Sequence, residues 1–153
     1  ALSLAKVMSR RLPANQLKEF LTKITQTYKN TLNQENSLTL LTLKAANALS
    51  MDDKDGAMIM LSEVVAKDPL NGSALLTLGS YYLQENELAK ALDYYDRASK
   101  VEAVQVDALL GATRVLVKKG KYLLAINRLK EAQAIKEQYF VAEYITTLEK
   151  FVN

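Results

Sequence analysis

Apolar residues recur along most of the chain with the spacing of an α-helix that is buried on one face. Leu75, Leu78 and Tyr82 show this three-to-four-residue spacing, and it returns at Leu109 and Leu116. No useful length of sequence alternates apolar and polar residues in the manner of a half-buried strand. The pattern therefore predicts an all-α protein. The expected helices cover residues 2–12, 15–32, 37–50, 55–67, 73–84, 88–100, 106–118, 122–135 and 139–151.

Helix-breaking residues separate these periodic segments. Pro69 ends one helix, because the residue before a proline is pushed out of the helical region. Gly120 is expected in a turn between two helices, where a glycine adopts a left-handed backbone at little cost. Asp52 or Asp53 is expected to cap the helix that follows, since a carboxylate accepts hydrogen bonds from the free N–H groups at a helix start.

An internal repeat organises the helices. Ala57, Ala91 and Ala125 follow one another at intervals of 34 residues, each in the second helix of a predicted pair. Helix pairs with this period are typical of helix–turn–helix solenoids. In this register Gly79 lies where the first helix comes close to a neighbour, because a residue without a side chain lets two helices approach. Tyr82 is expected to fill the space beside it.

The repeat resembles the tetratricopeptide repeat. The residues that carry the resemblance are Leu75-x-x-Leu78-Gly79-x-x-Tyr82, followed by Ala91-x-x-x-Tyr95-x-x-Ala98. Units at 38–71, 72–105 and 106–139 share the register, although Leu75 replaces the family's Trp and Ala45 and Thr113 replace its Gly. The resemblance implies a right-handed α-solenoid of stacked antiparallel helix pairs that forms one domain over 1–153.

The two ends depart from the repeat. Residues 140–153 are expected to form a capping helix with Phe140, Tyr144 and Leu148 on its apolar face, because a solenoid must cover its last apolar surface. Residues 1–37 are interpreted as a degenerate helix pair, since Lys23 stands 34 residues before Ala57. The alternative is that this segment is the remnant of a repeat in a longer protein.

Composition excludes the commonest enzyme chemistries. The chain has no Cys and no His, so Ser–His, Cys–His and zinc arrangements cannot form from its own residues. Asp52, Asp53 and Asp55 do not fit a Ca²⁺ loop, because Met58 and Leu61 stand where oxygen ligands belong. We therefore expect no catalytic residues, no metal and no cofactor.

Charge is distributed unevenly although the net charge is only +3. Residues 1–50 carry seven basic and two acidic side chains, residues 51–105 five and ten, and residues 106–153 eight and five. The net charge is too small to indicate a nucleic-acid partner. Two copies with such a pattern can instead attract each other, so a homodimer is the alternative to a monomeric adaptor. No apolar run is long enough for a membrane span, and no targeting segment assigns the chain to the cytoplasm or to a bacterial periplasm.

The resemblance also implies a binding surface, since the first helix of each pair lines the concave face of such a solenoid. Leu and Val at inward-facing positions favour a bound peptide or partner helix, with basic residues fixing its register. The candidate partner-binding residues are Thr42, Leu49, Leu76, Ser80, Leu83, Leu110, Arg114, Val117 and Lys118. Tyr81 and Tyr94 lie outside the core register and are further candidates for exposed contacts.

Some tetratricopeptide co-chaperones hold the C-terminal carboxylate of a chaperone with Lys and Asn side chains. The corresponding positions here are Thr42, Ala46, Thr77, Asp107 and Gly111. None is basic or Asn, and Asp107 repels a carboxylate. We therefore predict that this chain lacks such a clamp.

Overall fold

The computed structural model describes residues 2–152, and it divides into two compact units, Ala1–Pro69 (unit 1) and Leu70–Asn153 (unit 2). Nine α-helices and one short 3₁₀ segment account for the structure over these described residues, with no strand among them. The predicted all-α class is confirmed. Ala1 and Asn153, the outermost residues of the predicted 1–37 and 140–153 segments, lie outside the described residues.

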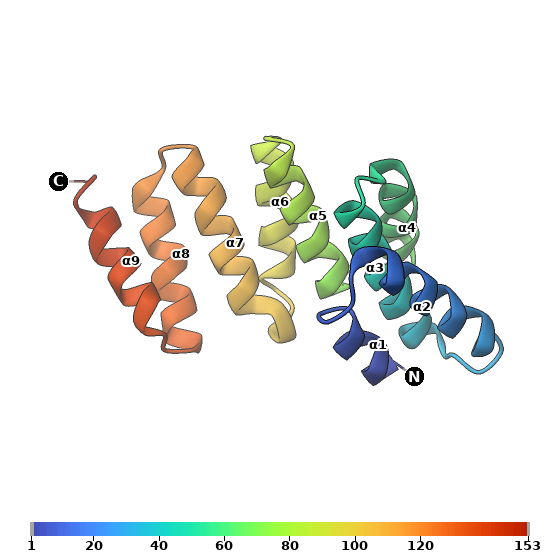
Figure 1. The fold of residues 1–153 in the computed structure, drawn as a ribbon. Helices are drawn as coiled ribbons and strands as arrows, with labels where there is room; N and C mark the ends of the chain where they lie inside the picture. Colours follow the sequence, from blue (N-terminus) through green and yellow to red (C-terminus); the bar gives the residue numbers. More distant parts are fainter. Residues whose placement is uncertain (1, 153) are drawn as a thin grey trace. The chain divides into compact units, whose positions relative to one another are not determined.

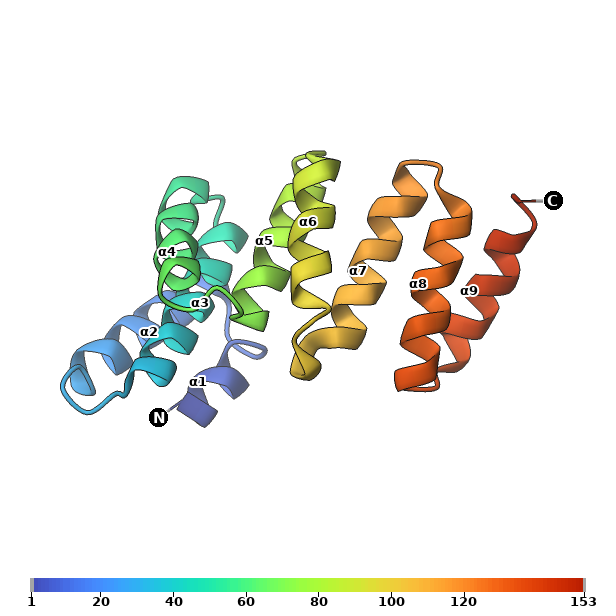
Figure 2. The ribbon, with the colours of Figure 1, turned by 180° about the vertical axis from the view of Figure 1, so that it is seen from behind.

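Unit 1 contains four helices, α1 (Leu2–Met8), α2 (Ala14–Thr27), α3 (Gln34–Ser50) and α4 (Lys54–Lys67). Helix α3 is central, because α1, α2 and α4 all pack against it (Figure 2). Ala5, Leu17, Leu21, Ile24 and Leu40 form one apolar cluster among α1, α2 and α3. These are the positions that the helical spacing places on one face of each helix.

The first two helices end earlier than the pattern predicts. Helix α1 stops at Met8 instead of residue 12, and the Ser9 hydroxyl donates to Lys6 O at 2.8 Å in the turn that follows. Pro13 follows four residues after Ser9 and disfavours the helical conformation at Leu12. Helix α2 ends at Thr27 instead of residue 32, in a turn whose N–H groups bond to Tyr28 O.

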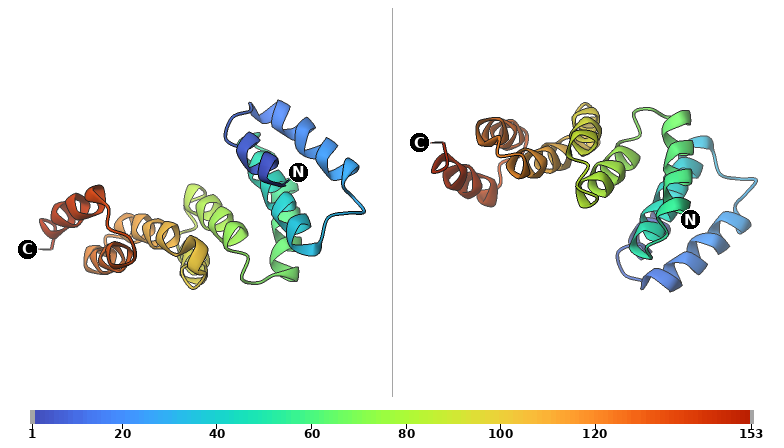
Figure 3. Two further views of the ribbon diagram at one scale, coloured as in Figure 1. Left: turned by 90° about the horizontal axis from the view of Figure 1, so that it is seen from below. Right: turned by 90° about the horizontal axis from the view of Figure 1, so that it is seen from above.

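Unit 2 contains α5 (Gly72–Gln84), α6 (Leu88–Ala98), the 3₁₀ segment η1 (Glu102–Val104), α7 (Gln105–Lys118), α8 (Tyr122–Ile135) and α9 (Tyr139–Glu149). Helices α7, α8 and α9 lie side by side (Figure 1). Viewed along the helices, α5, α7 and α9 form one layer and α6 and α8 the other (Figure 3). Unit 2 is thus a stack of helix pairs in which each second helix packs between two first helices.

The same turn joins the two helices of each pair. Asp52, Asn86 and Gly120 stand 34 residues apart, and all three have a left-handed backbone with φ of 62°, 60° and 68°. The next N–H donates back across the turn to a carbonyl five residues earlier, at 2.9 Å (53 to 48), 2.8 Å (87 to 82) and 2.9 Å (121 to 116). This hydrogen bond is typical of a Schellman helix end. The three hairpins α3–α4, α5–α6 and α7–α8 are therefore equivalent in backbone geometry.

Helix starts follow the capping rules in part. The Asp53 carboxylate accepts the Gly56 N–H at 3.0 Å at the start of α4, which settles the choice between Asp52 and Asp53. Asn71 caps α5 by accepting the Ala74 N–H at 3.1 Å. Asp52 cannot act as this cap because it occupies the left-handed turn position.

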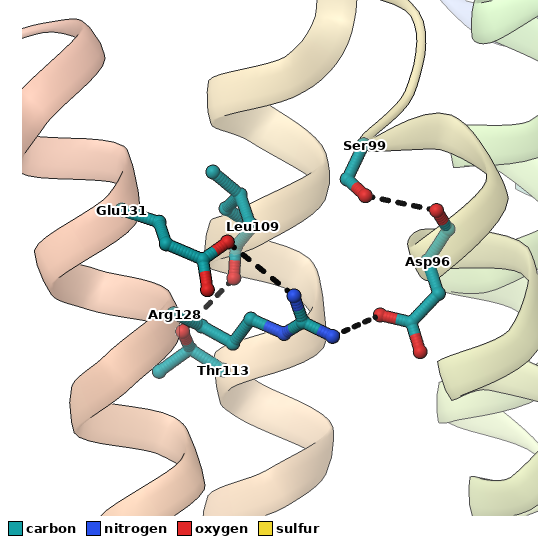
Figure 4. A network of polar contacts seen from close by, with 6 residues as sticks. All are labelled: Asp96, Ser99, Leu109, Thr113, Arg128 and Glu131. Carbon is teal, nitrogen blue, oxygen red and sulfur yellow. Dashed lines mark hydrogen bonds and ion pairs between the residues drawn. The ribbon is translucent and has the colours of Figure 1, made fainter.

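An ion-pair network links the two second helices of unit 2. Arg128 of α8 donates to the Asp96 carboxylate of α6 at 2.9 Å and lies 3.4 Å from Glu131 of its own helix (Figure 4). The Ser99 hydroxyl donates to Asp96 O at 2.8 Å. These groups are partly exposed, so the network holds α6 beside α8 with a modest contribution to stability.

The last helix turns Tyr144 and Leu148 of its predicted apolar face inward, and Phe140 is the exception. Val141 and Leu148 are buried against α8, and Tyr144 and Ile145 are half-buried. Phe140 was expected on the apolar face, but its side chain is 53% exposed. The spacing of Val141, Tyr144 and Leu148 fits one helical stripe, and Phe140 lies outside it.

Candidate interaction surface

The structure places most of the predicted partner-binding residues on two neighbouring first helices. Leu76, Ser80 and Leu83 lie on α5, and Leu110, Arg114, Val117 and Lys118 lie on α7, all in unit 2. Helices α5 and α7 contact each other directly. We call these seven residues the inner surface. Leu49 is half-buried in unit 1, on α3.

Thr42 does not belong to an accessible surface. Its side chain is 4% exposed, and its hydroxyl donates to Leu38 O of the same helix at 2.9 Å. The reason is that α3 is covered by α1, α2 and α4, so a position that is open in an ordinary repeat is enclosed here. Thr42 is therefore a buried residue whose polar group is satisfied within the helix.

The apolar members of the inner surface are half-buried rather than free. Leu76 and Leu83 pack against the cluster that contains Ala91, Tyr95 and Ala112. Leu110 and Val117 pack in the same way against the cluster around Leu116. Each side chain therefore stabilises unit 2 with one part of its surface and offers the other part to solvent or to a partner.

Tyr95 is a central residue of this region, although the sequence pattern placed it only in the repeat motif. It lies on α6 with 4% exposure. A Cβ added to Gly79 of α5 would lie 2.9 Å from the Tyr95 ring, and one added to Gly111 of α7 would lie 2.3 Å from it. Helices α5 and α7 can approach the ring because each has a glycine at the contact. Tyr82 was expected to fill the space beside Gly79, but the side chain that makes a glycine necessary at this position is Tyr95.

The phenol of Tyr95 on α6 lies close to residues of the inner surface on α5 and α7. Burial raises the pKa of the Tyr95 phenol, while the charge of Arg114 and a hydrogen bond with Ser80 lower that pKa. The phenol is therefore close to one residue of α5 and one of α7, both on the inner surface. The signal in the sequence was Gly111, a glycine inside a helix with no turn to explain it, which indicates close packing by a large side chain.

The two basic residues of the inner surface differ in their surroundings. Lys118 donates to Asn86 Oδ1 at 3.1 Å, so the turn between α5 and α6 holds its ammonium group. Arg114 is exposed, and over residues 2–152 no carboxylate forms an ion pair with it. Its guanidinium group is available to an acidic group of a partner.

Tyr81 and Tyr94 were predicted to make exposed contacts, but both rings pack against Tyr82. Tyr82 stacks on Tyr94 with ring centroids 5.4 Å apart and contacts Tyr81 edge-on at 5.1 Å. Lys90 lies 5.2 Å from the ring centre of Tyr82, and Arg97 lies 5.4 Å from that of Tyr94. Tyr81 and Tyr94 are half-buried. They form a structural aromatic cluster rather than two separate exposed contacts.

Neither metal chemistry nor a membrane span is visible in the part of the chain that the structure describes. Across residues 2–152 no three acidic side chains gather in a way that would hold a metal ion. None of the described helices combines the length and the hydrophobicity needed to cross a bilayer.

Comparisons with known proteins agree on the fold. No protein-family model matches the sequence, and no curated protein matches it. Among solved structures, the N-terminal domain of stress-induced protein-1 (STI-1) from C. elegans is similar with a TM-score of 0.70 and 15% identity, over 77% of this chain and 99% of that domain. A MamA D159K mutant is similar with a TM-score of 0.67 and 15% identity, over 97% of this chain and 81% of that one. Both are tetratricopeptide-repeat structures, and the present chain has the same all-α helical-repeat fold.

Proposed function

We propose that this chain is a non-catalytic protein-interaction module that binds a peptide or a partner helix on the inner surface of unit 2, as a scaffold or adaptor. The observation that supports this function is the unpaired guanidinium group of Arg114 among half-exposed leucine and valine side chains on α5 and α7. The tetratricopeptide-like fold supports it as well, because stacked helix pairs present extended surfaces for binding.

The surface suits a partner with apolar residues and one acidic side chain. Leu76, Leu83, Leu110 and Val117 offer apolar area, which contributes roughly 25 cal/mol per Å² buried. An acidic side chain on Arg114 adds a charge-assisted hydrogen bond of about 1.5–3 kcal/mol and fixes the register. The surface is rigid, since Tyr95 packs beneath it against Gly79 and Gly111, and a rigid site loses little entropy on binding.

Site-specific photo-crosslinking tests the location of the surface. A photoreactive amino acid replaces Ser80, which is exposed on α5 in the inner surface, or Ala89, which is exposed on α6 in the opposite layer. We expect crosslinks to a partner in lysate of the source cells from position 80 and not from position 89. Equal crosslinking from both positions would contradict the proposed surface.

Charge reversal tests the proposed role of Arg114. Arg114→Glu removes the free cation without disturbing an ion pair, so the fold should be unaffected while capture of the crosslinked partner falls about tenfold or more. Arg11→Glu is the matched control, because Arg11 is also exposed and unpaired within the described chain. If both variants capture the partner like the parent chain, Arg114 has no role in binding.

Self-association is a second candidate function. The observation in its favour is a group of exposed apolar side chains in unit 2, Leu123, Leu124 and Phe151, which are 63%, 50% and 63% exposed. Light scattering over a range of protein and salt concentrations distinguishes this function from a monomeric adaptor. If the measured mass equals that of one chain at all concentrations, self-association is excluded. A dimer in the parent chain that is lost in the Leu123→Ser variant supports self-association.

A further inference from the structure

Unit 1 contains a cavity that the proposed inner surface does not use. It has a volume of about 410 Å³ and lies among α2, α3 and α4. This size falls in the range of sites for small organic ligands. The residues that line it include two lysines and four apolar side chains.

The two lysines have no partner within the described chain. Lys18 projects from α2 and is exposed, and Lys44 lies on α3 and is half-buried. No ion pair or hydrogen bond joins either ammonium group to another described residue. Burial lowers the pKa of Lys44, which means that its charge has lost water without gaining an anion in return. An anion in the cavity would compensate that loss.

The polar groups around the lysines do not supply the missing anion. Asp53 is the one carboxylate of the lining, and its Oδ1 already accepts the Gly56 N–H at 3.0 Å as the cap of α4. Asn47 donates through Nδ2 to Ala14 O at 3.0 Å, but its buried Oδ1 has no donor in the described chain. With two lysines and one carboxylate, the lining carries one excess positive charge.

Apart from Thr22, the remaining lining is apolar. Leu21 and Ala48 are buried and form part of the wall. Met51 and Met60 add two unbranched thioether side chains, which adapt to ligands of different shape. A ligand that matches this cavity has an apolar body and an anionic end.

We propose that this cavity binds a small organic carboxylate, with the carboxylate between Lys18 and Lys44 and the apolar body against Leu21, Ala48, Met51 and Met60. Two ammonium groups recognise a carboxylate through charge-assisted hydrogen bonds. The site lies entirely in unit 1, so its test is independent of the inner surface of unit 2.

Octanoate is a suitable probe, because it combines one carboxylate with an unbranched apolar chain. Octanol has the same body without the charge and is the matched control ligand. We expect octanoate to bind the full chain with a dissociation constant of about 1 mM or below, and octanol to bind about tenfold more weakly. Calorimetry measures both affinities. Methyl NMR of the parent chain should show shifts at Leu21, Ala48, Met51 and Met60.

A lysine substitution tests the anion contact. Lys44→Met keeps an unbranched apolar stem and should weaken octanoate binding about tenfold while leaving octanol binding unchanged. Lys29→Met is the matched control, because Lys29 is exposed in unit 1 and does not line the cavity. Thermal unfolding checks the fold, and we expect Lys44→Met to melt no lower than the parent chain, since it removes a half-buried unpaired charge.

Three results would overturn the proposal. The first is equal affinity of octanoate and octanol for the parent chain, which would indicate an apolar site without anion recognition. The second is a set of NMR shifts outside α2, α3 and α4. The third is an acidic peptide that occupies the cavity and binds more tightly than octanoate, which would make the site a peptide site. The NMR comparison uses the parent chain alone, so it remains decisive even if a variant fails to fold.

Discussion

Tyr95 and Gly111 are in such close contact that the glycine cannot be exchanged for any other residue without movement. A Cβ on Gly111 would lie 2.3 Å from Cε1 of the buried Tyr95 ring. The two residues come from successive helices, α6 and α7, and Gly79 of α5 contacts the same ring. These contacts limit α5 and α7 to glycine at the positions that face α6.

Gly111→Ala should therefore lower the free energy of unfolding by about 1–3 kcal/mol, as overpacking of a core does. In an open helix the same exchange would raise stability by about 1 kcal/mol, because alanine is the better helix former. The sign of the change thus separates close packing from helix propensity. Urea denaturation measures it, and a stabilised variant would show that the ring yields easily.

Substitutions at the equivalent turn positions 52 and 120 should change the free energy of unfolding in opposite directions. Gly120→Ala places a side chain on a left-handed backbone with φ of 68°, so it should cost about 1 kcal/mol although the space around it is free. Asp52→Gly relieves the same strain and should stabilise the chain by a similar amount. Urea denaturation of both variants checks this. Changes of the same sign in the two variants would contradict equivalent turns.

Stability should fall in alkaline solution because of Tyr95. Its pKa is raised above the ordinary 10.0 by burial, so above about pH 10 the unfolded chain releases the phenol proton while the folded chain retains it. The stabilising contribution is present below pH 10 and is lost as the pH rises toward the folded pKa. Tyr95→Phe should flatten the alkaline part of a stability–pH profile, and an unchanged slope would assign the loss to other groups.

Arg114 should influence that titration from the inner surface. Its positive charge lowers the pKa of Tyr95, so Arg114→Gln should move the pKa of this phenol further upward. A spectrophotometric titration of the Tyr95 absorbance, identified by difference from Tyr95→Phe, measures the shift. No shift would mean that the guanidinium group lies too far from the phenol in solution.

The ion pair between Asp96 and Arg128 should contribute little. Their side chains are 41% and 32% exposed, and partly exposed pairs contribute about 0.2–1 kcal/mol. Asp96→Asn should lower the free energy of unfolding by less than about 1 kcal/mol, and 1 M salt should reduce the difference. Glu131→Gln is the control for the weaker contact at 3.4 Å. A loss much larger than this would show that the pair determines the spacing of α6 and α8.

The sequence predicted the helices well where they belong to repeats and less well elsewhere. The pairs α5–α6 and α7–α8 begin and end within two residues of their predicted bounds. The predicted end of α1 at residue 12 was wrong, and so was the inward position of Phe140 on α9, whereas Tyr144 and Leu148 lie inward as predicted. Seven candidate site residues lie together on α5 and α7, whereas Thr42 is buried.

The sequence by itself determined the 34-residue period, the helix pairs of the repeats and the turn at Gly120. These features depend on local spacing and on backbone preference, which each segment carries in its own residues. Only the tertiary structure decided that Thr42 is enclosed, that Tyr95 contacts both Gly79 and Gly111, and that two unpaired lysines line a cavity. Burial depends on which helices cover a given face, and that information comes from residues distant in the chain.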